Sequence, residues 1–594
     1  MLTDTSAPLA EPDNDGIVTL SDALSWQSLS PDSLLAGWLS GRNMGLVADR
    51  LQRSGALNVI ATSVPGIQDV LMLGHLRRLV DEGNYDRIIV DGPASGRARE
   101  LLRAPLMVAS VSSEGPIFDQ ATRANEMLCN PASSAVLLVT IAEETPINET
   151  IETAFDIEDD PGIRLAGVVV NRLFPMVEPP KSFNTHPLGL TVQSRFAFNS
   201  KQRQRLLDEL PVPHVDIAEN PVGVTSPQHI DELLSGTFEP ATNDGSEVTV
   251  PPFDGAALDA ALSRSIIVTV GTGGVGKTTL GAALAVRAAA MGRSVALITI
   301  DPAKRLADAL GLEKLDDDLR EVDIAGAGSG KLLATMLDPG ATFERVVRAE
   351  ATSDEHADQI LASPLAEQLT DSLSGMTEYM AVERLWQLHS DPDIDLVVVD
   401  TPPSSDALAF LDAPNLLARL LDNRIYKMLV HDKRGGLINR ALGGVVTQLV
   451  ATVGGTVVQE AVEFFKNFEG IEDDFRARGD LIYKALRSNA TDFIVVAIPT
   501  GASLSNAHDF TEQLRDSGVE PSLTIINRST PPVPKAGRSK AASAIVDHLW
   551  TKRTAERQNI AAFANRSSTP IVLVDDLPEP VANIEGIQTL AQNL

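Results

Sequence analysis

The sequence predicts an α/β protein with two doubly wound, mostly parallel sheets. The prediction depends on three observations. First, the strand-like run IIVTV leads into the glycine-rich stretch GTGGVGKTT at residues 271–279, and the helix-like LGAALAVRAAAM follows. Second, further apolar runs of strand length alternate with helical stretches from this loop onward, which is typical of parallel sheets. Third, several segments occur twice, in the same order, before and after the loop.

Length, composition and charge limit the class of protein. A chain of 594 residues is too long for one compact core, so several domains are expected. No apolar run reaches the length that spans a bilayer, so we expect no stable membrane insertion. The acidic N-terminal stretch lacks the features of a secretory signal, which favours a cytoplasmic protein. The formal net charge of −31 disfavours nucleic-acid binding, because Lys and Arg must neutralise the phosphates.

The stretch from Gly271 to Thr278 has the pattern G-x-x-x-x-G-K-T of a phosphate-binding loop. Its glycines allow backbone N–H groups to turn toward phosphates at the start of the following helix. Lys277 is expected to contact the β and γ phosphates, and Thr278 to ligate Mg²⁺ through its hydroxyl. The predicted nucleotide-binding residues of the loop are Gly273, Gly274, Val275, Gly276, Lys277, Thr278 and Thr279.

Two acidic residues follow predicted strands. Asp301 comes directly after SVALITI, and Asp400 ends DLVVVD. The carboxyl ends of parallel strands meet beside the loop, so Asp301 is placed to orient an attacking water and Asp400 to hold Mg²⁺ through water. For Asp301 the sequence is equally consistent with a cap at the N-terminus of the next helix.

Five segments in order, GGVGKTT, IDPAKRLADALG, SLSGMTEYMAVERL, VVVDTPPSSDALAFLDAP and IINR, resemble the ArsA-type ATPases. These are P-loop NTPases with a deviant Walker A motif, and they include the arsenical pump ATPase and the tail-anchored-protein targeting factor. The resemblance covers residues 259–594. It implies ATP and Mg²⁺ as cofactors and a helical insert at about residues 412–490.

The resemblance also implies roles for single residues. Asp301 falls on the family's switch-I aspartate and is, with Lys277, the expected catalytic residue. Asp400 falls on the aspartate linked to Mg²⁺, and Asn527 falls on the asparagine that contacts adenine.

A repeat precedes the loop. The segment VPGIQDVLMLGHLRRLVDEGNYDRIIVDGPASGRARELLRAP aligns without a gap to LSGMTEYMAVERLWQLHSDPDIDLVVVDTPPSSDALAFLDAP, which matches Asp91 with Asp400. Likewise LAGVVVNR matches SLTIINR, so that Asn171 corresponds to Asn527. Residues 1–60 contain no Gly-Lys-Thr loop and no D-P-A segment. The first copy therefore lacks the groups that bind a triphosphate.

These observations predict three parts of the chain. Residues 1–236 form a degenerate half without a phosphate loop, residues 237–258 a polar linker, and residues 259–594 the ATPase domain. Because family members work as dimers or as fused halves, we expect an intramolecular pseudo-dimer with one active site.

Two departures from the family pattern affect the function. Thr272 stands where a lysine usually reaches the partner's nucleotide, so hydrolysis is slow or a base such as Arg97 substitutes. An ordinary exposed arginine is the alternative for Arg97.

Cys129 is the only cysteine, so this chain alone cannot build a multi-thiolate arsenite site, and arsenite transport is disfavoured. A zinc clamp of paired cysteines, found in dimeric targeting factors, is disfavoured as well.

The predicted function is an Mg²⁺-dependent ATPase that couples its nucleotide state to an unknown protein partner or hydrophobic cargo. The apolar segment 435–467 either lines a groove for such cargo or packs as core. A nucleotide-gated scaffold with negligible hydrolysis is the alternative. A MinD-like membrane organiser is disfavoured, because the C-terminal IEGIQTLAQNL is not a basic amphipathic segment.

Overall fold

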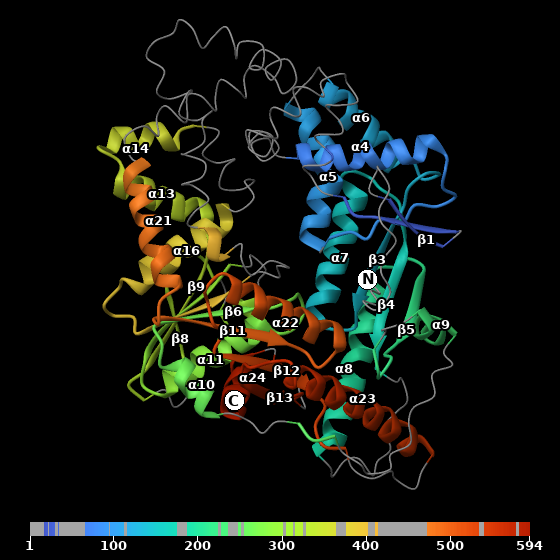
Figure 1. Cartoon of the computed structure of the whole chain (residues 1–594). Helices are drawn as coiled ribbons and strands as arrows, with labels where there is room; N and C mark the ends of the chain where they lie inside the picture. Colours follow the sequence, from blue (N-terminus) through green and yellow to red (C-terminus); the bar gives the residue numbers. More distant parts are fainter. Residues whose placement is uncertain are drawn as a thin grey trace, which may run out of the picture.

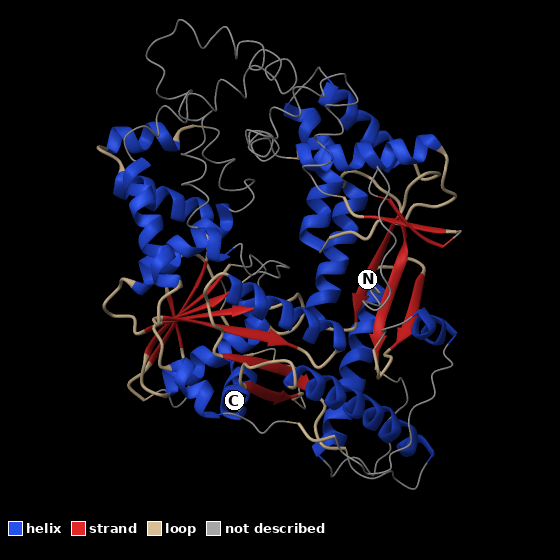
Figure 2. Cartoon of the chain, in the orientation of Figure 1, coloured by secondary structure: helices blue, strands red, loops and turns tan. Residues whose placement is uncertain are grey.

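The fold is described from a computed structural model of the chain (Figures 1 and 2). The described residues are 17–21, 23–29, 34, 66–93, 95–111, 116–174, 187–223, 227–235, 248–250, 255–300, 305–312, 315–324, 328–363, 376–401, 410–413, 472–533, 540–577, 581 and 583–594. Within these residues no helix combines the length and apolarity needed to cross a bilayer.

An eight-stranded sheet forms the centre of the C-terminal region, in the order β13-β12-β11-β6-β10-β7-β9-β8. All its strand pairs are parallel except that of β8 with β9. The prediction of an α/β fold with mostly parallel strands is therefore confirmed. The strands are β6 (Ile266–Val270), β7 (Ser294–Thr299), β8 (Arg320–Val322), β9 (Lys331–Met336), β10 (Leu396–Asp400), β11 (Thr491–Ala497), β12 (Leu523–Ser529) and β13 (Ile571–Asp575).

Helices cover both faces of this sheet, because its strands are apolar on both sides. One face packs against α10 (Gly255–Leu262), α11 (Lys277–Ala290), α12 (Arg305–Leu310) and α24 (Ile584–Asn593). The other packs against α13 (Pro339–Glu350), α14 (Asp354–Leu361), α16 (Met376–His389), α21 (Glu472–Leu486), α22 (Gly501–Asp516) and α23 (Lys540–Ala564). Helix α10 begins inside the predicted linker 237–258, and α21 lies inside the predicted insert 412–490.

The N-terminal region contains a second, smaller parallel sheet in the order β3-β4-β5. Its strands are β3 (Val136–Ile141), β4 (Leu165–Leu173) and β5 (His214–Ala218), and β1 (Ile17–Ser21) pairs separately with β2 (Leu24–Gln27). The helices are α4 (Ile67–Glu82), α5 (Ser95–Val111), α6 (Pro116–Cys129), α7 (Glu144–Asp159), α8 (Pro187–Glu209) and α9 (Pro227–Ser235). In Figure 1, α4, α5 and α6 lie across the molecule from α13, α14, α16 and α21.

The small sheet repeats a detail of the large one. The pairing of β4 with β5 shifts register just before Leu173, and that of β12 with β13 shifts just before Ser529. Arg172 (φ 54°) and Arg528 (φ 57°) precede these residues, and among the described residues they alone combine a side chain with a positive φ. The sequence match of LAGVVVNR with SLTIINR thus has a counterpart in backbone conformation.

The match does not extend to every segment. Residues 87–91 (RIIVD) align in sequence with β10, yet they form no strand, and Ile89 is 86% exposed. Asp91 is exposed too, whereas Asp400 is fully buried at the end of β10. The first copy therefore does not reproduce the position of the Asp400 carboxylate.

Helices α8 and α23 cross each other in Figure 1, and apolar side chains packed between them join the two regions. The apolar cluster between them consists of Phe174, Leu188, Val192, Ile545, Val546 and Leu549. Two ion pairs cross beside it, Arg195 with Asp576 (2.9 Å) and Lys552 with Glu219 (2.8 Å). We call these residues the α8–α23 interface.

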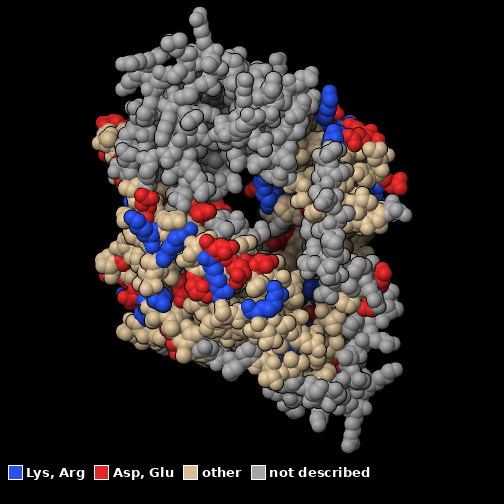
Figure 3. Space-filling model, in the orientation of Figure 1, with Lys and Arg blue, Asp and Glu red and all other residues tan. Residues whose placement is uncertain are grey.

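On the face drawn in Figure 3, acidic and basic side chains are interspersed over the described surface.

Candidate nucleotide-binding site

The backbone between β6 and α11 requires glycine at two positions. Gly271 has φ 154°, and a Cβ there would collide with the carbonyl oxygen of Val496 on β11. Gly276, directly before α11, has φ 92°, and its Cβ would collide with the side-chain amide of Asn527. These close approaches hold the loop against the ends of β11 and β12.

Lys277 begins α11 and its ammonium group lies against the loop. Nζ donates hydrogen bonds to the carbonyl oxygens of Gly271 (2.9 Å) and Thr272 (3.0 Å). The residue is only 6% exposed. The positive charge is therefore held beside the backbone turn that binds phosphates in loops of this kind.

The start of α11 has the character of an anion site. No side chain caps the helix at Gly276, although the first N–H groups of a helix need partners. Gly273 and Gly274 are exposed, and Thr278 and Thr279 are half-buried. Uncapped N–H groups together with the ammonium of Lys277 fit a phosphate group.

Asp400 ends β10, which lies between β6 and β7, and it is fully buried. Its Oδ2 accepts a hydrogen bond from the hydroxyl of Thr299 on β7, at 3.0 Å. Helix α11 comes close because Gly281 has no side chain: a Cβ there would lie 4.0 Å from the Cβ of Asp400. Thr278 precedes Gly281 by one turn on the same side of α11. Hydroxyl and carboxylate oxygens suit Mg²⁺, so these residues fit the predicted ion.

Asn527 reaches the loop from β12. Its Nδ2 donates a 2.9 Å hydrogen bond to the carbonyl oxygen of Val275, and the residue is 7% exposed. The structure thus brings Asn527 to a loop residue far away in sequence.

Some predicted features lie outside the described residues. Asp301 is one of them, although β7 ends at Thr299, two positions before it. The segment 435–467 also lies outside them. Thr299 was not predicted as a site residue; its one signal in the sequence is a hydroxyl in the apolar run just before Asp301.

Arg97 contacts its own region. Its guanidinium group donates to Asp69 (2.8 Å) and to Glu100 (2.9 Å). Burial raises the pKa of Asp69, although Arg97 beside it acts in the opposite direction. Among the described residues Arg97 forms these ion pairs within its own region and none with the loop, which agrees with an ordinary surface arginine. Cys129 is half-buried against an apolar cluster, and burial raises the pKa of its thiol.

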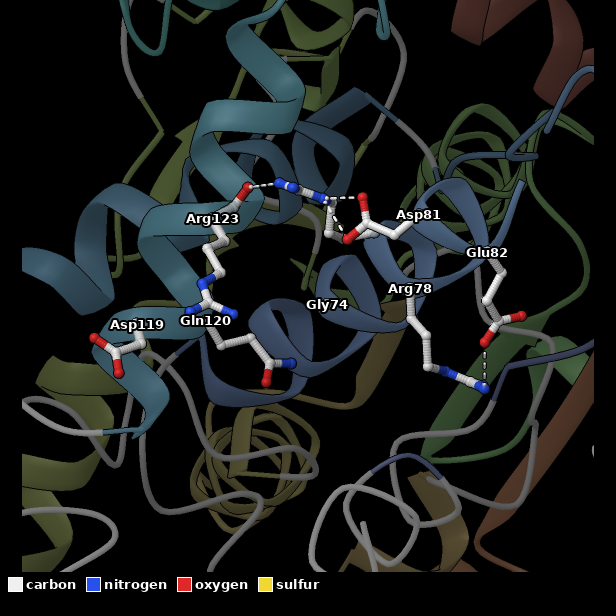
Figure 4. A pocket seen from close by; sticks show the side chains of 8 residues that line it. Gly74, Arg78, Asp81, Glu82, Asp119, Gln120 and Arg123 are labelled. Carbon is white, nitrogen blue, oxygen red and sulfur yellow. Dashed lines mark hydrogen bonds and ion pairs between the residues drawn. The ribbon is translucent and has the colours of Figure 1, made fainter. Parts of the chain in front are cut away.

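A separate cavity of about 380 Å³ lies between α4 and α6 (Figure 4). It is lined by charges of both signs, and Arg77 and Arg78 pair with Asp81 and Glu82 one turn along α4. None of its lining residues belongs to the phosphate loop. The cavity is therefore distinct from the candidate nucleotide site.

The chain is similar in sequence to known proteins. The family model described as anion-transporting ATPase matches residues 41–115 and 264–554. The ATPase GET3 of Chaetomium globosum is 26% identical over 288 residues, which cover 47% of this chain and 79% of that protein. The ATPase GET3 of Podospora anserina is 26% identical over 296 residues, 50% of this chain and 80% of that protein. The ATPase get3 of Schizosaccharomyces pombe is 26% identical over 259 residues, 43% and 71% of the two chains.

The family match covers more than half of the chain and includes the loop, β10 and β12. The family is one of ATPases. The chain belongs to the anion-transporting, ArsA-type ATPase family and is an ATPase.

Proposed function

We propose that ATP is bound and hydrolysed at a single site per chain, the loop 271–279. One observation carries the proposal: Lys277, Asp400 and Asn527 come from three different elements and all lie against this loop or the helix that follows it. Such convergence is the requirement for phosphoryl transfer, where positioning and charge stabilisation supply most of the catalysis.

Each residue has a distinct part in the proposed reaction. Backbone N–H groups of the loop and the ammonium of Lys277 bind the β and γ phosphates, and Lys277 exchanges its two carbonyl partners for phosphate oxygens. Thr278 and Asp400 hold Mg²⁺, which supplies charge neutralisation at the phosphates when bound. Asp301 orients the attacking water, and Asn527 contacts the adenine.

We further propose that residues 1–236 are a degenerate half, joined by the linker 237–258 to the ATPase domain 259–594. The repeated register shift and the left-handed Arg172 and Arg528 support a common origin of the two parts. The family model also matches a segment in each part. Residues 1–60 lack a Gly-Lys-Thr loop, so one site per chain is expected.

The α8–α23 interface supports an intramolecular pseudo-dimer. Arg195 precedes Glu219 by the same number of residues as Lys552 precedes Asp576. Each basic residue pairs with the acid of the other part, as expected for a two-fold contact. Nucleotide binding would change how the two parts pack and so act on a protein partner or hydrophobic cargo in the cytoplasm.

A nucleotide-gated scaffold is the second candidate. Thr272 favours it, because no lysine stands where one assists hydrolysis in relatives. The scaffold would bind ATP in the same loop and use the same pseudo-dimer, with negligible turnover.

Steady-state ATPase activity and ATP affinity of the wild type, Lys277→Ala and Asp301→Asn distinguish the two candidates. Lys277→Ala should lose ATP binding, while Asp301→Asn should bind ATP and lose turnover. Arg97→Lys is the matched control and should behave like the wild type. Wild-type turnover no higher than that of Asp301→Asn would support the scaffold instead.

A further inference from the structure

We propose that Thr299 is a positioning residue for the Asp400 carboxylate and thereby sets the affinity of the site for its divalent cation. The proposal rests on the proposed role of Asp400 as the carboxylate linked to Mg²⁺. It adds a residue on β7, which lies outside the phosphate loop and the helix that follows the loop.

The contact is a buried hydrogen bond from a hydroxyl to a carboxylate. The Oγ1 of Thr299 donates to Oδ2 of Asp400 at 3.0 Å, and the two residues are 1% and 0% exposed. Hydrogen bonds to an ionised acceptor are stronger than neutral ones, and water exclusion strengthens them further. A donor fixed on one oxygen also fixes the plane of the carboxylate, and with it the direction of the other oxygen.

The backbone leaves Thr299 little freedom. It stands opposite Asp400 in the parallel register of β7 and β10, where the N–H of Ile300 donates to the carbonyl of Asp400 at 3.1 Å. On the other side, the N–H of Leu337 donates to the carbonyl of Thr299 at 2.9 Å. The β-branched side chain has a restricted χ1 angle, so its hydroxyl is held in place before any ligand binds.

Neighbouring buried threonines show what sets Thr299 apart. Thr269 donates its hydroxyl to the carbonyl of Val399 (3.1 Å), and Thr401 donates to the carbonyl of Thr269 (2.7 Å). These bonds connect strands at their carboxyl ends. Only the bond of Thr299, within this group of three, ends on the carboxylate proposed to serve the metal.

Removal of the Thr299 hydroxyl should therefore lower the affinity for the metal ion while the protein remains folded. Loss of an outer partner of a metal ligand typically lowers metal affinity by about 10–100-fold. Because Asp400 is expected to hold Mg²⁺ through water, we expect the lower end, about tenfold.

The test uses the full chain with a non-hydrolysable ATP analogue and Mn²⁺, whose binding is followed by electron paramagnetic resonance. Thr299→Val keeps the side-chain volume and removes the donor, whereas Thr299→Ser keeps the donor. Thr335→Val is the matched control, because Thr335 is fully buried on the neighbouring strand β9 and its hydroxyl donates to the backbone carbonyls of Asp316 and Asp317. The Mg²⁺ concentration for half-maximal ATPase activity is the second readout.

The expected result is about tenfold weaker Mn²⁺ binding in Thr299→Val, near wild-type binding in Thr299→Ser, and no change in Thr335→Val. Wild-type Mn²⁺ affinity in a folded Thr299→Val protein would overturn the proposal. So would equal losses in Thr299→Val and Thr335→Val. If Asp400→Asn also bound Mn²⁺ like the wild type, the proposed role of Asp400 would itself fail, which separates the two conclusions.

Discussion

The ammonium group of Lys552 lies 2.8 Å from the carboxylate of Glu219, which links α23 to the end of β5. The side chain of Glu219 is only 7% exposed, and His548 and Arg172 approach the same carboxylate. Burial acts to raise the pKa of Glu219, yet Lys552, His548 and Arg195 together hold it well below its ordinary value. The carboxylate is therefore charged at neutral pH and is stabilised by cations from both regions.

Glu219→Gln should lower the thermal unfolding midpoint at neutral pH, because it leaves the largely buried ammonium group of Lys552 without its carboxylate. We expect a loss of about 3–5 kcal/mol, the usual cost of breaking a buried ion pair. A carboxylate whose pKa is depressed on folding stabilises the protein at pH values above its pKa in the unfolded chain, which is about 4.3 for Glu. This stabilisation is lost as the pH falls through the lower pKa of the folded protein. Calorimetric midpoints from neutral to acidic pH measure both effects.

Asp576→Asn is the control for this prediction. Its pair with Arg195 is more exposed, at 27% and 31%, so its effect on the midpoint should be smaller. Equal midpoints for Glu219→Gln and the wild type at neutral pH would show that the α8–α23 interface does not depend on this ion pair.

Gly276→Ala should abolish nucleotide binding. The new Cβ would collide with the amide of Asn527, and the residue would keep a strained positive φ of 92°. Gly292→Ala is a matched control with φ 91°, because its Cβ would meet only the Ser329 hydroxyl at 3.4 Å. Both variants should lose about 1–2 kcal/mol of stability from backbone strain. Of these two variants, only Gly292→Ala should bind a fluorescent ATP analogue. Binding of the analogue to both variants would contradict the geometry proposed for the loop.

Thr272→Lys should leave turnover within about twofold of the wild type. In relatives this lysine acts on a nucleotide in the partner, and the proposed pseudo-dimer has no second nucleotide for it to reach. Initial rates at saturating ATP and Mg²⁺ test this expectation. A turnover rate at least tenfold higher than that of the wild type, which corresponds to an activation barrier lowered by about 1.4 kcal/mol, would contradict it. It would mean that the lysine reaches a nucleotide at a second site.

Local patterns predicted the loop and the strand ends of the site. Gly271 to Thr278 and Asp400 carry strong local signals, because strand, turn and helix start follow one another directly in sequence. The hydrogen bond of Asn527 to Val275 was not predictable from them. It depends on β12 being the second strand from β6, with β11 between them, and sheet order is a long-range property.

The N-terminal region shows the limit of sequence matching. Residues 87–91 have the apolar pattern of β10, but a strand forms only where neighbours pair with it, and here no strand forms. The pairs Arg195–Asp576 and Lys552–Glu219 join residues far apart in sequence, and surface charge patterns do not specify their partners.

We expect one nucleotide site per chain, at the loop that contains Lys277. Equilibrium titration of the full chain with a non-hydrolysable ATP analogue and Mg²⁺ tests it most directly. We expect one bound nucleotide per chain in the wild type and none in Lys277→Ala. Two nucleotides per wild-type chain, or one retained by Lys277→Ala, would contradict it.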